Sequence, residues 1–332
     1  MRILIIGCGL IGELHAQTIQ RAGGHSLVLA ESRPEILQSV AALVQPEACY
    51  TDYRQALERE QCDAALICTP NALHAVQAID ALSAGCNVLC EKPIATSAED
   101  ARAMCEAAKA NRKVLMVGYG MRVNSCVNRI REIIASGTLG RPVAARVVLA
   151  KPETLVEAKT QYRRDYKTGG GILFDYSHEL DYCSLFFGRA QRCACFKRLA
   201  VCSEQETCDD CADFIIQYES GLCAVCHFDY IQSYGQGRGR WIGITFEHGF
   251  VETDFVSEMK IWNNNGDMAV YCPHNPGRWW SLEKQFELFC SVAAGKDGGE
   301  YTWATGESSA EIAALVEALY RAADTGEIVS LP

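Results

Sequence analysis

The segment IIGCGLIGELH at residues 5–15 restricts the fold of this chain more than any other part of it. Its glycines, Gly7, Gly9 and Gly12, are spaced as G-x-G-x-x-G between a short apolar stretch and a helical pattern. In a strand–turn–helix unit, the first glycine permits a tight turn and the second lets the backbone approach a pyrophosphate. The third lets the helix pack closely on the strand, and the helix N-terminus offers unpaired N–H donors to an anion. By itself, the spacing is shared by glycine-rich turns that bind no ligand.

An acidic residue further along strengthens the dinucleotide interpretation. Glu31 follows Gly12 by 19 positions and lies near the end of the apolar stretch SLVLAES. A carboxylate at this place accepts hydrogen bonds from an adenosine ribose and repels a 2′-phosphate, so it favours NAD over NADP. Arg33 could instead meet a phosphate, which leaves NADP as the alternative cofactor.

Short apolar stretches alternate with helical patterns over the first 120 residues. Helices are predicted at residues 72–85 and 97–112, where Gly85 and Asn111 stand at the expected ends. This alternation predicts a doubly wound parallel sheet, and hence an NAD(P)-binding Rossmann domain at residues 1–120. The predicted strands are RILIIG, SLVLAES, AALICT, NVLCEK and VLMVGY.

The pattern changes after residue 120. A helix is predicted at residues 124–137 and a strand at 141–151, followed by strand-like runs to about residue 272. A helical tail at 306–326 follows, with Ser308 or a neighbour as its N-cap and Gly326 as its end. Grouped strands with segregated helices predict an α+β domain at residues 121–332, built on a largely antiparallel sheet.

Charge and hydropathy exclude several function classes. The net charge is −10, which argues against a nucleic-acid or anionic membrane partner, because both need a positive field. No run of 18 or more apolar residues is present, so a membrane span is not expected. The first residues, MRILIIG, are interpreted as a strand and not as a signal peptide, so we expect a cytoplasmic protein.

The chain has 18 cysteines, which we interpret as reduced thiols that are largely buried. Cys208 with Cys211, and Cys223 with Cys226, form two C-x-x-C pairs that resemble a zinc ribbon. However, the segment 211–230 has the pattern of a hairpin that turns at Glu219-Ser220-Gly221. In a strand, Cys223 and Cys226 point to opposite faces, so we expect no metal, with structural zinc kept as the alternative.

The segment GGGILFDYSHELDY at residues 169–182 concentrates groups that can act as acids or bases. Asp175, His178, Glu179 and Tyr182 fall at i, i+3, i+4 and i+7, so a single helix would place them on one face. An ordinary surface face could look the same, but the glycines before it permit close approach of a ligand. A histidine is the natural acceptor of a hydroxyl proton, and Asp175 could orient the substrate or the imidazole.

Two further segments lie where the parallel strands should end. CTPNALH at residues 68–74 lies at the end of one predicted strand. LCEKPIA at residues 89–95 includes the end of the next predicted strand, NVLCEK. Ligands bind at this edge in doubly wound folds. Asn71 could serve only as a helix cap, and His74 could simply face solvent. A lysine at position 92 could polarise a hydroxyl or carbonyl and stabilise alkoxide charge during hydride transfer.

Together, the glycine fingerprint, TPNALH and EKP resemble the glucose–fructose oxidoreductase/inositol dehydrogenase/MocA (Gfo/Idh/MocA) family. The resemblance extends over nearly the whole chain, including residues 117–148 and 285–331. It implies a Rossmann domain followed by an α/β domain with an open, mostly antiparallel sheet. It also implies an NAD(P)-dependent oxidoreductase that transfers a hydride between nicotinamide and a hydroxyl or carbonyl of a sugar, polyol or sugar derivative. In this family the second domain, here residues 121–332, is expected to bind the substrate and to form oligomers.

The family resemblance assigns roles to particular residues. It places Lys92 beside the nicotinamide and the substrate, and it implies a cis peptide bond between Lys92 and Pro93. Family members commonly carry a histidine four residues after the aspartate of the glycine-rich turn. Here His178 follows Asp175 by three, so either His178 or Glu179 occupies that place.

The site predicted from the sequence therefore has three parts. The expected catalytic residues are Lys92, His178 and Asp175. The expected cofactor-binding residues are Gly7, Gly9, Leu10, Ile11, Gly12, Glu31, Thr69, Pro70, Asn71, His74, Glu91 and Lys92. The expected substrate-binding residues are Arg122, Tyr162, Arg163, Asp175 and His178.

Two alternatives to a conventional dehydrogenase stay open. One is a relative that recycles a tightly bound NAD, as an aldose oxidoreductase or a glycosidase-type enzyme does. The other is a dinucleotide-binding regulator without turnover. A homo-oligomer, either a dimer or a tetramer, is compatible with each of them.

Overall fold

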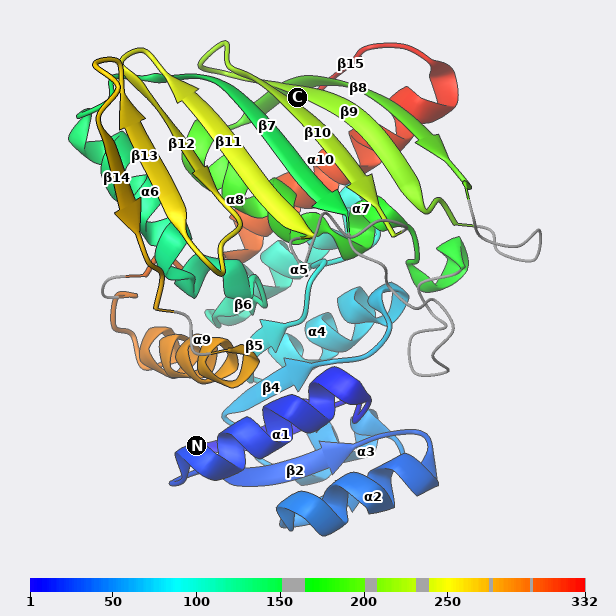
Figure 1. Cartoon of the computed structure of the whole chain (residues 1–332). Coiled ribbons are helices and arrows are strands. Elements are labelled where there is room, and N and C mark those ends of the chain that lie inside the picture. The colour runs from blue at the N-terminus through cyan, green and yellow to red at the C-terminus, as the bar shows by residue number, and fades with distance from the viewer. Residues whose placement is uncertain (151–164, 201–207, 231–238, 275–276, 299–300, 332) are drawn as a thin grey trace. The chain divides into compact units, whose positions relative to one another are not determined.

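The computed structural model describes residues 1–150, 165–200, 208–230, 239–274, 277–298 and 301–331 (Figure 1). The chain divides into two compact units. Unit 1 comprises Met1–Gly120 and Pro276–Ala313, and unit 2 comprises Met121–Asn275 and Ala314–Pro332. Among the described helices, none combines the length and the apolar character that crossing a membrane requires.

Unit 1 is built on a six-stranded sheet in the order β3-β2-β1-β4-β5-β6, and all of its strand pairs are parallel. This confirms the predicted doubly wound fold. The central strands β1 and β4 are almost completely buried, as expected for parallel strands covered on both faces. The strands are β1 (Arg2–Ile6), β2 (Ser26–Ala30), β3 (Ala48–Tyr50), β4 (Ala64–Ile67), β5 (Asn87–Cys90) and β6 (Leu115–Val117).

The helices of unit 1 follow the sequence signals closely. Helix α4 ends at Ser83, shortly before Gly85, whose φ is +91°. Helix α5 begins after the N-cap Ser97, whose side chain accepts a hydrogen bond from the Asp100 N–H, and it ends at Asn111 as predicted. The short β3 and the helices α2 and α3 were not among the predicted elements. The helices are α1 (Leu10–Ala22), α2 (Pro34–Val44), α3 (Tyr53–Arg59), η1 (Asn71–Leu73), α4 (His74–Ser83), α5 (Ala98–Asn111) and α9 (Arg278–Ala293).

A segment from the far end of the chain completes unit 1. The guanidinium of Arg21 on α1 lies 3.7 Å from the ring centre of Trp279 on α9. The ring of His25 packs edge-on against Phe286 of the same helix, with ring centres 5.1 Å apart. Beyond α9, the N–H of Val117 donates to the Ala304 carbonyl at 2.9 Å, which extends the β6 edge of the sheet. Contacts between distant segments therefore hold this part of the fold together.

Unit 2 contains a nine-stranded sheet in the order β14-β13-β12-β11-β7-β10-β9-β8-β15. Among the strand pairs that the structure describes here, only β7 and β10 are parallel, so the predicted mostly antiparallel sheet is confirmed. The strands are β7 (Pro142–Ala150), β8 (Ala190–Arg198), β9 (Cys211–Tyr218), β10 (Cys223–Asp229), β11 (Arg240–Phe246), β12 (Gly249–Thr253), β13 (Met259–Asn263), β14 (Met268–Tyr271) and β15 (Val329–Ser330).

The helices of unit 2 are η2 (Gly120–Val123), α6 (Ser125–Ser136), η4 (Tyr166–Thr168), α7 (Ile172–Asp175), α8 (Ser177–Phe187) and the part of α10 (Gly306–Thr325) that follows Ala313. The longer ones, α6, α8 and α10, lie behind the sheet in the view of Figure 1. The sheet face toward these helices is apolar and buried, for example at Ile216, Ala224 and Phe228. The other face, which we call the open face, exposes Phe196, Ile215 and Val225, and no described helix covers it.

The hairpin of β9 and β10 confirms the strand interpretation of the second C-x-x-C pair. The two strands are antiparallel and are joined through a turn at Glu219–Leu222. Cys223 is exposed while Cys226 is buried, because positions three apart in a strand point to opposite faces. The two C-x-x-C pairs therefore do not form a zinc ribbon.

Candidate functional site

The glycine fingerprint in unit 1 has the geometry that its spacing predicts. Gly7 has a φ of +92°, and a Cβ added there would lie 2.7 Å from the Thr69 side chain. A Cβ on Gly12 would lie only 1.9 Å from the Gly7 carbonyl oxygen, so no larger residue fits between α1 and the turn. These two positions require glycine for physical reasons, one for its backbone conformation and the other for close helix packing.

The start of α1 is suited to an anion. Gly9 is the N-cap of this helix, and a Cβ added there would meet no atom within 4 Å. The first N–H groups of α1, including those of Leu10 and Ile11, have no carbonyl partner within the helix, and the helix dipole adds partial positive charge. An approaching phosphate can therefore reach N–H donors at this turn, so the residues present fit a dinucleotide.

Glu31 is fixed against the same turn. Its side chain is buried, and Oε2 accepts a hydrogen bond of 2.9 Å from the N–H of Cys8, between Gly7 and Gly9. The guanidinium of Arg33 donates to both carboxylate oxygens, at 2.8 and 3.1 Å. Burial raises the pKa of Glu31, but the hydrogen bonds from Arg33 and Cys8 outweigh this effect and lower the pKa below its ordinary value. The carboxylate is therefore an anion held at the glycine turn.

The loops after β4 and β5 are joined by a buried histidine. The Nδ1 atom of His74 lies 2.8 Å from the Pro93 carbonyl oxygen, and its Nε2 atom lies 3.0 Å from that of Thr69. Burial lowers the pKa of His74, although the two carbonyls oppose this shift. The suggestion that His74 faces solvent is wrong, since its ring is fully buried. Its contacts position the Thr69–Asn71 loop and the turn that carries Lys92.

The EKP segment is anchored from α1. The Glu91 carboxylate lies 2.8 Å from Nε2 of His15, whose side chain is buried on α1. Burial raises the pKa of Glu91, but the His15 hydrogen bond and the nearby Lys92 charge lower it overall. The sequence interpretation missed His15, although its position three residues after Gly12 places it one helical turn further along. The predicted cis peptide bond between Lys92 and Pro93 is present, and Lys92 is half-buried after β5.

In unit 2, the segment 169–182 is not one helix. Gly169 and Gly171 have φ values of +82° and +117°, and the one-turn helix α7 ends at Asp175. Tyr176, with ψ near +26°, separates α7 from α8. The expectation that Asp175 shares one helical face with His178, Glu179 and Tyr182 is therefore wrong. Residues 172–175 form a separate turn, in which the Asp175 N–H donates to the Gly171 carbonyl at 3.1 Å.

A buried aspartate that the sequence interpretation missed holds this glycine turn. Asp209 accepts hydrogen bonds from the N–H of Ile172 at 3.2 Å and from the hydroxyl groups of Tyr166 and Tyr320. A Cβ on Gly171 would lie 2.3 Å from the Tyr320 hydroxyl oxygen, so the turn packs tightly against α10. Burial raises the pKa of Asp209, while its hydrogen bonds act in the opposite direction.

Asp175 lies at the end of α7 with its side chain largely buried. One carboxylate oxygen accepts a hydrogen bond of 3.1 Å from the hydroxyl of Tyr230, which follows β10. The Tyr230 ring packs edge-on against Tyr176, with ring centres 5.0 Å apart. The Asp175 carboxylate is therefore oriented by a neighbouring strand end, as a group that positions a substrate or an imidazole should be.

Burial separates the two candidates for the proton acceptor. Glu179 is 1% exposed, and its carboxylate is paired with the guanidinium of Arg240 at the start of β11. Tyr182 is fully buried in the aromatic core of unit 2 beside Phe255. His178 is only partly buried. Of the adjacent pair, His178 is thus the more accessible residue, and Glu179 is engaged inside unit 2.

Arg122, which is predicted to bind the substrate, forms an ion pair within unit 2. Its guanidinium is buried and binds the Asp181 carboxylate of α8 through two nitrogens, at 2.9 and 2.6 Å. Burial raises the pKa of Asp181, and the Arg122 charge opposes that shift. This pair anchors η2 to α8, so Arg122 supports the helix that carries His178. The other predicted substrate contacts, Tyr162 and Arg163, lie outside the described residues.

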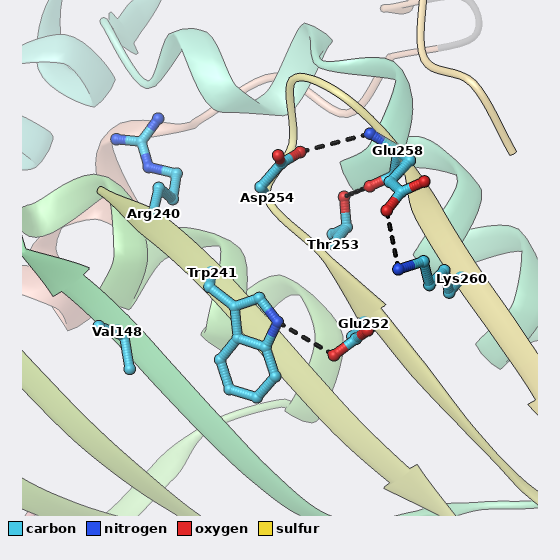
Figure 2. A pocket seen from close by; sticks show the side chains of 8 residues that line it. All are labelled: Val148, Arg240, Trp241, Glu252, Thr253, Asp254, Glu258 and Lys260. Atoms are coloured by element: carbon cyan, nitrogen blue, oxygen red, sulfur yellow. Dashed lines mark hydrogen bonds and ion pairs between the residues drawn. The ribbon is translucent and has the colours of Figure 1, made fainter. Parts of the chain in front are cut away.

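A pocket of about 330 Å³ lies elsewhere in unit 2. Figure 2 shows the Trp241 indole lying along β11, with Nε1 donating to the Glu252 carboxylate at 3.3 Å. None of the residues predicted from the sequence lines this pocket. Its lining residues are Val148, Arg240, Trp241, Glu252, Thr253, Asp254, Glu258 and Lys260.

Two family models match the chain. Residues 1–119 match a model described as an oxidoreductase family with an NAD-binding Rossmann fold. Residues 127–252 match the GFO/IDH/MocA C-terminal domain. The two matches follow one another along the chain and together cover most of it.

Curated relatives and solved structures agree with these models. The uncharacterized oxidoreductase YrbE of Bacillus subtilis is 30% identical over 55% of this chain and 53% of its own length. Myo-inositol 2-dehydrogenase of Thermotoga maritima is 27% identical over 57% of this chain and 55% of its own length. The chain thus spans about half the length of these relatives. D-glucoside 3-dehydrogenase of Escherichia coli is 25% identical over 100% of this chain and 97% of its own length.

Among solved structures, levoglucosan dehydrogenase in complex with NADH has the same fold, with a TM-score of 0.88 and 20% sequence identity. The similarity covers 100% of this chain and 99% of that one. The fold similarity therefore covers the full chain and not only the two segments that the family models match.

Proposed function

This chain belongs to the GFO/IDH/MocA oxidoreductase family, and from that premise we propose that it is an NAD-dependent dehydrogenase of a sugar, polyol or sugar derivative. The observation that carries the proposal is the Glu31 carboxylate hydrogen-bonded to the N–H of Cys8 inside the glycine turn. The contact supports the proposal, because a carboxylate held there could accept hydrogen bonds from a ribose whose pyrophosphate lies at the same turn. The named activities of the inositol and glucoside dehydrogenases support the substrate class.

The residues that would hold NAD all lie in unit 1. The Gly7–Gly12 turn and the N–H groups of Leu10 and Ile11 would receive the pyrophosphate. Glu31 would accept hydrogen bonds from the adenosine ribose, and its negative charge disfavours NADP. The loops at the carboxyl ends of β4 and β5 would complete the site, with contributions from Thr69, Pro70, Asn71, Glu91 and Lys92 and with His74 as the residue that positions them.

Lys92 and His178 are the proposed catalytic residues. When bound, NAD supplies the carbon that accepts or returns the hydride. The Lys92 ammonium would stabilise negative charge on the substrate oxygen, and the His178 imidazole would accept the hydroxyl proton during oxidation. Asp175 would orient the imidazole or a substrate hydroxyl. Arg122 would act through α8 as a positioning residue, because its guanidinium is paired with Asp181.

We further propose that the protein is a cytoplasmic homo-oligomer that assembles through the open face of unit 2. None of the described cysteines forms a disulfide, which fits a reducing compartment. Phe196 is 73% exposed on this face, and Ile215 and Val225 are 46% and 51% exposed. A second copy of the chain would remove these neighbouring apolar side chains from water.

The test of the catalytic proposal is the pair of variants Lys92→Met and Lys109→Met. Lys109 is exposed on α5, so Lys109→Met also removes one positive charge from unit 1, but away from the end of β5. Formation of NADH is followed by absorbance against a panel of sugars, polyols, sugar acids and nucleotide sugars, and NAD binding is measured by calorimetry.

We expect Lys92→Met still to bind NAD, because the Gly7–Gly12 turn and Glu31 would be unchanged. Turnover should fall by about 10²–10⁴-fold, the range for loss of a positioned acid–base or electrostatic group. Lys109→Met should match the wild-type protein in both measurements. Full turnover in Lys92→Met would refute the assignment of this lysine. Wild-type protein that binds NAD but turns over no substrate in the panel would favour a binding role over catalysis.

A further inference from the structure

Four side chains form a compact group on the β9–β10 hairpin of unit 2. Cys211 and Asp229 are direct partners across the two antiparallel strands, and so are Asp213 and His227. Positions 211 and 213 lie two apart in β9, and 227 and 229 lie two apart in β10, so all four point to the same sheet face. Directly opposed side chains in such a ribbon have Cβ atoms about 4.5–5.5 Å apart. The strand register therefore brings together a thiol, an imidazole and two carboxylates.

The ligand atoms of three of these residues are close enough to share one ion. The Cys211 sulfur, an Asp213 carboxylate oxygen and a ring nitrogen of His227 all lie within 4.8 Å of one another. The imidazole is held from both sides, with Nδ1 2.6 Å from Asp213 Oδ1 and Nε2 2.8 Å from Asp229 Oδ2. Its ring plane and its direction are thus already fixed by the two carboxylates.

We propose that this group is a zinc site in which Cys211 Sγ, Asp213 Oδ1 and His227 Nδ1 coordinate one Zn²⁺ ion. The ion would replace the proton between Nδ1 and Asp213 Oδ1, and Asp229 would keep its hydrogen bond to Nε2–H of His227. A carboxylate behind a coordinating histidine is the usual arrangement in zinc proteins. Three protein ligands leave the fourth position of a tetrahedral ion to water.

The choice of metal follows from the donor atoms. A thiolate and an imidazole suit Zn²⁺, whereas Mg²⁺ and Ca²⁺ prefer sites made only of oxygen ligands. Arg198 donates to the second oxygen, Asp213 Oδ2, at 3.2 Å, so Oδ1 remains directed toward His227. The set differs from the two C-x-x-C pairs seen in the sequence: of those four cysteines, only Cys211 contributes.

The position of the group in the fold suggests a structural role. Asp209 and Asp210 immediately precede β9, and Tyr230 immediately follows β10. The N–H of Tyr230 donates to the Asp210 carbonyl at 3.0 Å, so the two strand ends are already joined. Asp209 holds the glycine turn at Ile172, and Tyr230 holds the Asp175 carboxylate. An ion bound at Cys211 and His227 would hold together the start of β9, next to Asp209, and the end of β10, next to Tyr230.

The inference is tested by metal binding and does not depend on turnover. The full-length protein is stripped with a chelator and titrated with Zn²⁺ by calorimetry, with bound zinc counted by elemental analysis. Co²⁺ is then used as a spectroscopic probe, because a thiolate–cobalt charge-transfer band reports a cysteine ligand. The variants are Cys211→Ser, His227→Gln and, as the matched control, Cys223→Ser. Cys223 is an exposed cysteine on the same hairpin and the same sheet face.

We expect one Zn²⁺ per wild-type chain, a higher melting temperature with zinc than without it, and a thiolate–cobalt band. Cys223→Ser should keep all three, and Cys211→Ser should lose the band and the thermal stabilisation. His227→Gln removes a direct ligand and should bind zinc at least 10-fold more weakly, because the loss of an outer-shell partner alone already weakens binding about 10- to 100-fold. If Cys211→Ser unfolds, Asp213→Asn serves as a second probe. The Asp213 side chain is half exposed, so its substitution should disturb the fold less.

The absence of stoichiometric zinc uptake by the wild-type protein would overturn the proposal. So would equal losses in Cys211→Ser and Cys223→Ser, because the 18 cysteines of the chain would then bind the metal without a defined site. Zinc binding that survives both His227→Gln and Asp213→Asn would overturn it as well.

Discussion

Glu31 is a single residue whose role depends on the neighbours that fix it. Its carboxylate is 4% exposed, while the side chain of its partner Arg33 is 55% exposed. The buried carboxylate therefore cannot move easily, whereas the guanidinium can swing toward solvent or a ligand. The sequence suggested that Arg33 could recruit a 2′-phosphate, but in the structure its charge is directed at Glu31.

Glu31→Gln should weaken NAD binding and reduce the preference for NAD over NADP. The amide keeps the size of the side chain but loses the charge, and a hydrogen bond to a charged group contributes about 1.5–3 kcal/mol. We therefore expect the Kd for NAD to rise about 10- to 100-fold, with a smaller rise for NADP. Calorimetric titration with each dinucleotide measures both values.

Glu35→Gln is the control, because Glu35 is an exposed acid in the first turn of α2. It removes the same charge without touching the glycine turn, so both Kd values should stay close to those of the wild type. An unchanged ratio of the two Kd values in Glu31→Gln would contradict the role of Glu31 in cofactor choice.

Among the elements, the turn between β12 and β13 is held by the carboxylate of Asp254. Asp254 Oδ1 accepts hydrogen bonds from the N–H groups of Val256 and Ser257 at 3.0 and 2.7 Å. Burial raises the pKa of Asp254, but these backbone hydrogen bonds outweigh it and lower the pKa below its ordinary value. A carboxyl whose folded pKa is depressed stabilises the fold above its unfolded pKa, about 3.9, and loses that contribution as the pH falls through the folded pKa.

Asp254→Asn should therefore melt at a lower temperature than the wild type at neutral pH. The difference should shrink below about pH 4, because protonation removes the same charge from the wild-type side chain. Thermal melts followed by circular dichroism between neutral and acidic pH measure it. Asp267→Asn, in the exposed turn that follows β13, is the control, and it should change the melting temperature little at any pH. A difference that is constant across the pH range would show that the charge of Asp254 does not matter.

For the whole molecule, the open face of unit 2 is the surface that most needs an explanation. Phe196, Ile215 and Val225 lie on the neighbouring strands β8, β9 and β10 and are all exposed. Contiguous apolar side chains on a sheet are costly in water and promote association. This is the observation behind the proposed homo-oligomer.

Ile215→Asp should dissociate that oligomer, since it places a charge at the centre of the exposed apolar group. Light scattering coupled to size-exclusion chromatography gives the molar mass of each variant. Leu43→Asp is the control, because Leu43 is 52% exposed on α2 of unit 1. A wild-type protein that is monomeric, or a mass that is unchanged in Ile215→Asp, would contradict assembly through this face.

The sequence by itself determined the parallel sheet of unit 1, the mostly antiparallel sheet of unit 2 and the glycine turn with Glu31. These features depend on local rules. The spacing of apolar residues determines whether a segment forms a strand or a helix. Gly7 needs glycine for its positive φ, and Gly12 needs it because a Cβ would clash with the Gly7 carbonyl five residues earlier. The same rule correctly separated Cys223 from Cys226, because the alternation of a strand acts over three residues.

Only the tertiary structure decided which partner each polar side chain takes. Glu179 binds Arg240, Arg122 binds Asp181, and Asp209 holds the glycine turn, although each pair is far apart in the sequence. The register of β9 against β10 likewise brings Cys211 to His227. Periodicity along a chain shows which face of an element is buried, but it carries no information about the segment packed against that face. Long-range packing and strand register therefore supply the partners.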